Sequence, residues 1–172
     1  HVELTREIVR RFNQLYRPVF PEPDVLLTEA QKVPGLDGRK MSKSYGNAVF
    51  LSDAPKEIDA KISRMMTDPA RVKRTDPGEP EKCPAFQLHK IYCTPEEIEY
   101  VTQGCRTASI GCLECKKIMI QHVIEELAPI RERRAEFENH PERVEEILDN
   151  GTHAAQQKAG ATMAEVRETI GL

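Results

Sequence analysis

The distribution of apolar residues in this chain offers almost no segments that could form the strands of a β-sheet. One short apolar stretch, residues 25–27, has the character of a strand or an extended segment. A parallel sheet cannot be built from one strand, and the other apolar residues recur mostly at helical intervals. The sequence therefore predicts a mainly α-helical protein, with a small α/β-like remnant over residues 1–53 and an all-helical domain over residues 54–172. We expect a segment on the N-terminal side to supply the rest of the α/β part.

Helical periodicity predicts seven helices. Asp53 fits the N-cap of the second, and Thr94, followed by Pro and two Glu, fits the start of the fourth. Pro129 should kink the long fifth helix, and residues 149–151 should separate the last two. The predicted helices cover residues 3–16, 54–66, 84–93, 94–103, 112–139, 141–148 and 152–170.

The composition restricts the class of protein. The 172 residues carry 25 Lys+Arg against 28 Asp+Glu, a net charge of −3, and 39% of them are hydrophobic. That apolar share supports a packed core, and the charge excludes the whole-surface basic field of a non-specific nucleic-acid binder, although it leaves a local basic patch open. No stretch approaches the ~20 apolar residues that cross a bilayer, and the start of the chain lacks the pattern of a signal peptide. We expect a cytoplasmic protein that does not bind membranes.

The sharpest motif lies in a glycine-flanked loop, PGLDGRKMSKSYGN, over residues 34–47. Lys40 and Lys43 are three residues apart, so their ammonium groups can reach the oxygens of one polyphosphate, and the hydroxyls of Ser42 and Ser44 add neutral donors. Such a loop can neutralise charge that develops on a leaving pyrophosphate. The alternative is a solvated loop without a function.

The cysteines form a second motif. Four of the five follow the pattern C-x21-C-x6-C-x2-C, at Cys83, Cys105, Cys112 and Cys115. Zinc ribbons usually offer two close pairs, and only one is present here, so the pattern is nearer to iron–sulfur ligation. Structural zinc and unligated core thiols remain as alternatives. Cys93 falls outside the pattern and is expected to be a small buried hydrophobe.

The histidines show no metal-binding or catalytic spacing. We expect ordinary surface or capping roles for His89, His122, His140 and His153.

Residues 33–53, VPGLDGRKMSKSYGNAVFLSD, resemble the signature loop of class I aminoacyl-tRNA synthetases and, with its flanks, the tryptophanyl-tRNA synthetases of bacterial type. Residues 1–13 and 127–172 are similar to further segments of that family. The tyrosyl-tRNA synthetases, a third possibility, usually depart from Lys-Met-Ser-Lys-Ser at this loop. The cysteine spacing is similar to that of a subset of the family with a [4Fe–4S] cluster in the anticodon-binding domain, whose first interval is one residue longer.

The resemblance implies Mg²⁺- and ATP-dependent activation of tryptophan, transfer to tRNA-Trp, and a cytoplasmic homodimer. It assigns residues 1–53 to the C-terminal part of a Rossmann-like catalytic domain and residues 54–172 to a helical anticodon-binding domain. Lys40 and Lys43 become the catalytic residues that hold pyrophosphate in the transition state. The implied ATP-binding residues are Val33, Lys40, Met41, Ser42, Lys43 and Ser44.

The chain lacks the family's HIGH-type motif and its Gly-Glu-Asp-Gln segment, so we expect this portion to be inactive by itself. Lys116 and Lys117, beside the last cysteines, are the expected tRNA contacts. The competing interpretation is a non-catalytic four-cysteine zinc module that binds RNA or protein. The pyrophosphate-binding loop favours the synthetase, because a binding module does not need one.

Overall fold

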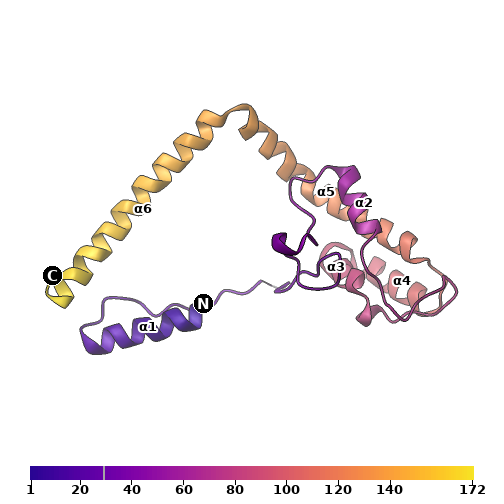
Figure 1. Ribbon diagram of the computed structural model, residues 1–172, viewed down its shortest axis with the longest axis horizontal. Coiled ribbons are helices and arrows are strands. Elements are labelled where there is room, and N and C mark those ends of the chain that lie inside the picture. Colours follow the sequence, from indigo (N-terminus) through magenta and orange to yellow (C-terminus); the bar gives the residue numbers. More distant parts are fainter. Residues whose placement is uncertain (29) are drawn as a thin grey trace. The chain divides into compact units, whose positions relative to one another are not determined.

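A computed structural model describes residues 1–28 and 30–172, and the regular structure in this part of the chain is helical (Figure 1). Among the described residues there is no strand, and the isolated bridge joins Pro34 to Lys40. The expectation of a mainly α-helical protein is confirmed. The elements are α1 (Val2–Leu15), η1 (Lys43–Tyr45), α2 (Pro55–Ser63), η2 (Pro80–Lys82), α3 (Pro84–Tyr92), α4 (Pro95–Arg106), α5 (Cys112–Asn139) and α6 (Pro141–Ile170).

The chain divides into two units. One contains residues 1–28 with 137–172, and the other contains residues 30–136. In the first, the guanidinium of Arg17 pairs with Glu168 at 3.2 Å and so links the segment after α1 to α6. The second contains the lysine loop, the cysteines and the main core. A domain boundary at residue 53 stays a prediction.

Local sequence explains where most helices begin. At α4 the Thr94 hydroxyl accepts a hydrogen bond from the Glu97 amide, and the Glu97 carboxylate accepts one from the Thr94 amide, which is the expected capping box. The cap of α2 differs from the prediction: it is Ala54, one residue after Asp53. The Asp53 carboxylate is engaged elsewhere, because it accepts the Phe50 amide at 2.8 Å and pairs with Lys61.

The predicted break between the last two helices is wrong. Helix α6 runs unbroken from residue 141 to residue 170, through Asp149-Asn150-Gly151. A glycine inside a helix costs about 1 kcal/mol relative to alanine, and the surrounding Ala, Glu, Gln and Lys residues favour helix strongly enough to offset that. The His153 imidazole also donates to the Asp149 carbonyl at 3.0 Å across the interruption.

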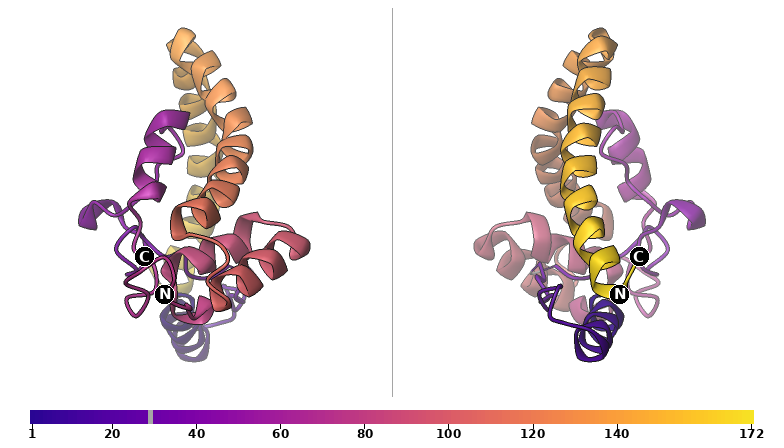
Figure 2. Two further views of the ribbon diagram at one scale, coloured as in Figure 1. Left: turned by 90° about the vertical axis from the view of Figure 1, so that its right-hand side faces the viewer. Right: turned by 90° about the vertical axis from the view of Figure 1, so that its left-hand side faces the viewer.

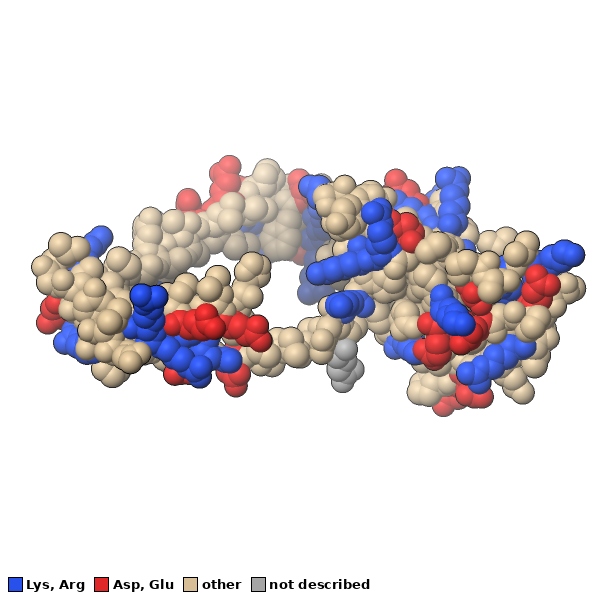
Figure 3. All heavy atoms as spheres, turned by 60° about the horizontal axis from the view of Figure 1, so that its bottom comes forward, with Lys and Arg blue, Asp and Glu red and all other residues tan. Residues whose placement is uncertain are grey.

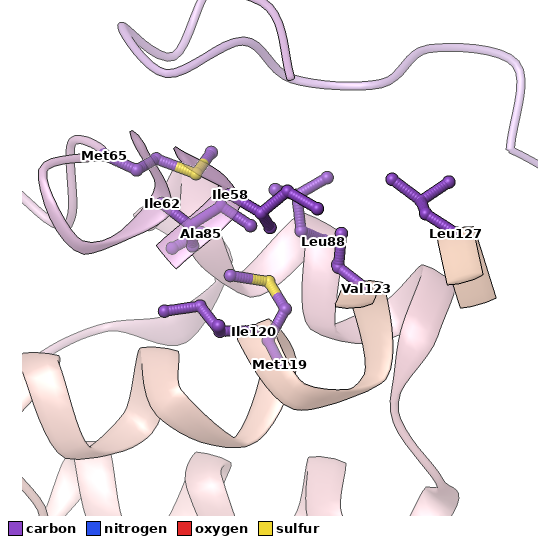
Figure 4. Packing of buried hydrophobic residues seen from close by; sticks show 9 residues of the cluster. All are labelled: Ile58, Ile62, Met65, Ala85, Leu88, Met119, Ile120, Val123 and Leu127. Carbon is purple, nitrogen blue, oxygen red and sulfur yellow. The ribbon is translucent and has the colours of Figure 1, made fainter. Parts of the chain in front are cut away.

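The main core of the second unit lies where α2 and α3 pack on α5. Figure 4 shows aliphatic and methionine side chains from these helices, and from the segment after α2, pointing toward one another. Each fully buried side chain of this kind contributes about 1.5–3 kcal/mol. The members are Ile58, Ile62, Met65, Ala85, Leu88, Met119, Ile120, Val123 and Leu127.

A second cluster, formed by Phe86, Val101 and Ile110, joins α3 to α4. Cys115 and Ile118 of α5 pack against it, so the first turns of α5 contact α3 and α4 (Figure 2). The ends of three helices are thereby brought to one place.

No helix in the described part of the chain has the length and apolar character needed to cross a membrane. On the face that Figure 3 shows, Lys and Arg side chains are interspersed with Asp and Glu, as the small net charge predicts.

Candidate functional site

The lysine loop is closed by one buried side chain, that of Asn47, which is 3% exposed. Its amide nitrogen donates to the Asp37 carboxylate at 2.7 Å, and its amide oxygen accepts the Ser42 backbone N–H at 2.8 Å. The Asn47 carbonyl accepts the Leu36 N–H at 2.8 Å. Asn47 therefore fixes both ends of the loop to each other.

Two glycines make this closure possible. A Cβ atom on Gly35 would lie 2.2 Å from the Asn47 amide nitrogen, so a larger residue at position 35 would displace that side chain. Gly46 has a φ of 65°, the left-handed conformation that glycine adopts without strain, and it ends the short η1 turn. The hydrogen bond from Asn47, with the Arg39 guanidinium beside it, lowers the pKa of Asp37, so this carboxylate stays ionised.

The loop presents its cations to solvent. Lys40 and Lys43 are exposed, and within the described residues neither ammonium takes part in an ion pair. The hydroxyls of Ser42 and Ser44 lie 2.8 Å apart on the same turn, and the Met41 amide donates to the Val33 carbonyl at 2.9 Å. This arrangement provides two accessible positive charges and adjacent hydroxyl donors, which suit a polyphosphate.

The four patterned cysteines come from the ends of three helices. Cys83 is the N-cap of α3, Cys105 lies in the last turn of α4, and Cys112 and Cys115 lie in the first turn of α5. All are half-buried and free of disulfides. Burial raises the pKa of Cys115 to about 12, and the three other thiols add to the effect, so the four groups interact electrostatically.

A buried arginine lies against this thiol cluster (Cys83, Cys105, Cys112 and Cys115). Arg71 is 8% exposed and donates to the carbonyls of Ile110 at 2.7 Å and Arg74 at 2.9 Å. It also approaches the Cys105 sulfur at 3.9 Å, and its buried Nε has no hydrogen-bond partner. A guanidinium with an unsatisfied donor, near the Cys105 thiol of the cluster, suits a group of negative charge.

Lys116 is buried, whereas Lys117 is exposed. The Lys116 ammonium donates to the carbonyls of Ser63 at 2.9 Å and Met65 at 2.5 Å, just after α2. Burial lowers its pKa, against the opposing influence of the nearby thiols. A tRNA contact for this pair stays a prediction, and the exposed Lys117 is the member that a phosphate can reach.

His89 is a residue that the sequence patterns missed. Its expected surface or capping role is wrong, because it is completely buried on α3. One ring nitrogen, Nε2, lies 3.2 Å from the Cys115 sulfur, and the other, Nδ1, lies 3.2 Å from the Cys93 sulfur. Burial lowers the pKa of His89 to about 4, so the ring is neutral near pH 7. The available signal was the spacing of His89 on α3 and Cys93, the C-cap of that helix four residues later.

Among the described residues, the group of three potential metal ligands whose ligand atoms all lie within 4.8 Å is Cys93, Glu97 and His122. The four patterned thiols are spread more widely than that. Glu97 and His122 already have partners in each other, at 2.8 Å, and Glu97 also belongs to the capping box of α4.

Comparison with known proteins gives the class to which this chain belongs. The family model for class I tRNA synthetases (W and Y) matches residues 1–128. The chain therefore belongs to the class I tRNA synthetases of the tryptophan and tyrosine group.

The curated relatives to which the chain is similar are ligases for one amino acid, tryptophan. The chain is 50% identical to the tryptophan–tRNA ligase of Aquifex aeolicus over 173 residues, covering 100% of this chain and 44% of that protein. It is also 50% identical to the ligase of Thermotoga maritima, covering 100% of this chain and 53% of that protein. The chain thus spans about half the length of the curated relatives it matches.

Solved structures agree with the fold. The tryptophanyl-tRNA synthetase of Campylobacter jejuni complexed with ADP and tryptophan has a TM-score of 0.75 and 29% identity. The match covers 100% of this chain and 54% of that chain.

Proposed function

We propose that this chain is the part of a tryptophan–tRNA ligase that carries the ATP-phosphate loop and a helical tRNA-binding domain. The complete protein would activate tryptophan with Mg²⁺-ATP and transfer it to tRNA-Trp. The observation that carries this proposal is the exposed pair Lys40 and Lys43 on a loop closed by Asn47. The tryptophan–tRNA ligases that resemble the chain at 50% identity support the choice of amino acid.

The loop would act on the leaving group. As the bond between the α- and β-phosphates breaks, negative charge develops on pyrophosphate, and the ammonium groups of Lys40 and Lys43 would stabilise it. Ser42 and Ser44 would donate hydrogen bonds to the same oxygens, while Val33 and Met41 form the pairing at the base of the loop.

The test is ATP–pyrophosphate exchange in the complete protein. Lys43→Ala should slow tryptophan-dependent exchange by about 10²-fold, because removing one donor to a developing anion has an effect of this size. Lys56→Ala, an exposed lysine at the start of α2, is the matched control and should leave exchange unchanged. Exchange with tyrosine alone would assign the chain to the tyrosyl enzymes. Exchange with neither amino acid would favour the zinc-module alternative.

We further propose that Cys83, Cys105, Cys112 and Cys115 hold a [4Fe–4S] cluster, with structural zinc as the alternative. Two observations support the larger group. The thiols are spread more widely than the ligands of one tetrahedral zinc ion, which bind at about 2.3 Å. In addition, the unpartnered Nε of Arg71 suits a cluster of negative charge. When bound, the cluster would cross-link the ends of α3, α4 and α5.

Metal analysis after anaerobic purification separates these alternatives. About four iron and four sulfide per chain, with a visible charge-transfer spectrum, are expected for the cluster. About one zinc without sulfide would establish the structural zinc site instead.

For tRNA, we propose a binding surface beside the thiol cluster. A hollow of about 510 Å³ lies there, and exposed Lys117 follows Cys115 and Lys116 in the first turns of α5. Basic side chains of this kind bind phosphates and position the nucleic acid without choosing its sequence. The hollow is lined by residues that include Arg71, Lys73, Arg74, Cys112 and Glu114, and Arg74 pairs with Glu114 at 3.1 Å. By resemblance, the complete protein would be a cytoplasmic homodimer.

A further inference from the structure

The fully buried ring of His89 lies between two sulfur atoms. Its two nitrogens lie 3.2 Å from the sulfurs of Cys115 and Cys93, on opposite sides of the ring. Cys115 belongs to the thiol cluster and Cys93 does not. The three side chains therefore form a hydrogen-bonded row that runs from the cluster to a fifth cysteine.

Chemistry fixes the direction of both hydrogen bonds once Cys115 binds a metal. A metal-bound thiolate has no hydrogen to donate, so His89 must carry its hydrogen on Nε2 and donate it to Cys115. A neutral imidazole with Nε2–H has an acceptor at Nδ1. Cys93 must then be a protonated thiol that donates to Nδ1. Burial raises the pKa of Cys93 to about 11, which agrees with a protonated thiol near pH 7.

Burying a histidine at this position would cost free energy if its two ring nitrogens had no hydrogen-bond partners. His89 lies beside Leu88 and Phe86 of the core, where an apolar side chain could pack without burying two polar nitrogens. Both nitrogens find their partners on sulfur. The ring is thus satisfied by the two cysteines.

We propose that His89 is a positioning residue for the metal centre, donating a hydrogen bond to the Cys115 thiolate, and that Cys93 fixes the tautomer of His89 that can do so. This inference rests on the proposed metal-binding role of the thiol cluster. A hydrogen bond to a ligand sulfur stabilises its negative charge, and hydrogen bonds of this kind are among the factors that set the reduction potential of iron–sulfur clusters.

Three variants test this relay (His89 with Cys93) in the complete, metal-loaded protein. His89→Phe keeps an aromatic ring and removes the donor. Cys93→Ala removes the group that fixes the tautomer, and Cys93→Ser retains a hydroxyl donor for Nδ1. Tyr92→Phe is the matched control, because it alters a half-buried ring on the same helix that is neither of the two hydrogen-bond partners of His89, Cys93 and Cys115. His89→Met, which also lacks a nitrogen donor, replaces the phenylalanine variant if the helical circular dichroism shows that the latter fails to fold.

The measurements are the rate of iron loss to a chelator and the reduction potential of the cluster in dithionite titrations. His89→Phe should lose iron about 10-fold faster than the parent, the lower end of the range for removing such a partner, and its potential should fall. Cys93→Ala should change both in the same direction by less. Cys93→Ser and Tyr92→Phe should match the parent.

Each other outcome is decisive. Parental potential and iron loss in a folded His89→Phe protein would overturn the relay and leave the cluster in place. Zinc in the parent would overturn the cluster, and the same variants would then test the relay by the rate of zinc release. A parent that binds neither metal would overturn both proposals.

Discussion

The side-chain amide of Asn47 donates a 2.7 Å hydrogen bond to the carboxylate of Asp37, across the base of the loop that carries Lys40 and Lys43. The oxygen of the same side-chain amide accepts a hydrogen bond from the Ser42 backbone N–H. The shape of the proposed phosphate loop is therefore set by residues that lie outside the Lys-Met-Ser-Lys-Ser string.

Asn47→Ala should open this loop. The half-buried Asp37 carboxylate and Ser42 amide each lose a hydrogen bond, which should lower the free energy of unfolding by about 1–3 kcal/mol, and tryptophan-dependent exchange in the complete protein should fall about 10-fold. Trypsin should cleave after Lys40 and Lys43 faster than in the parent. The control is Asn150→Ala, an exposed asparagine of α6. Unchanged cleavage and exchange in Asn47→Ala would mean that the loop holds its shape without this side chain.

Two glycine substitutions should have effects of opposite sign. Gly35→Ala places a Cβ 2.2 Å from Asn47 and should lower the free energy of unfolding. Gly151→Ala lies in open space on α6 and should raise it by about 0.5–1 kcal/mol, because alanine favours helix. Thermal unfolding of the two variants beside the parent measures both. Stabilisation by Gly35→Ala would contradict the packing of Asn47 at the loop base.

Substitution of Lys116 should affect the stability of the fold, whereas substitution of Lys117 should affect tRNA binding. Lys116→Met removes the donor to the Ser63 and Met65 carbonyls and should destabilise the helical unit by about 1–3 kcal/mol. Lys117→Met should leave the unfolding temperature unchanged, weaken tRNA binding and reduce the slope of log affinity against log salt by about one. Unfolding scans and filter binding at several salt concentrations distinguish them. A tRNA defect in a Lys116→Met protein of parental stability would contradict its structural assignment.

The ionised Asp68 carboxylate should stabilise the folded protein near neutral pH, and this contribution should be lost in acid. Its buried carboxylate accepts the amides of Glu79 at 2.8 Å and Ala70 at 3.0 Å, and these hydrogen bonds lower its pKa below the ordinary value. The ionised form is therefore favoured in the folded state. Its contribution is full above the unfolded pKa of about 4 and is lost as the pH falls through the lower folded value. Asp68→Asn should accordingly be less stable than the parent at pH 7, and the difference should shrink in denaturant titrations below pH 4.

Loss of the proposed metal centre should loosen the ends of three helices. Replacing Cys112 and Cys115 together by serine should abolish iron binding and lower the midpoint of thermal unfolding. Iron analysis and circular dichroism of the purified variant measure both effects. Parental stability in a protein without iron would show that the cluster has no structural role.

The sequence predicted local structure better than structure that depends on distant contacts. The capping box at Thr94 and the long helix from Cys112 follow from neighbouring residues, and both are present. The break at Gly151 was wrong because a local glycine signal was outweighed by many good helix formers. The chemistry of the lysine loop also follows from spacing within a few residues.

The parts that the sequence did not predict arise between helices. His89 meets Cys115 because α3 packs against the start of α5, and no local pattern specifies that contact. The closure of the loop by Asn47 depends on Gly35, twelve positions earlier, having no side chain. The burial of Lys116 likewise depends on carbonyl groups some fifty residues earlier in the chain.

The burial of Lys116 beside an exposed neighbour has a practical consequence. Amine-reactive reagents in water should acylate Lys117 rapidly, whereas the Lys116 amine is shielded and bonded to two carbonyl oxygens. Mass spectrometry after a short acylation pulse can therefore compare the labelling of Lys116 with that of Lys117 in the same molecule. Label on Lys117 reports the dose, and label on Lys116 reports how often the segment after α2 separates from α5.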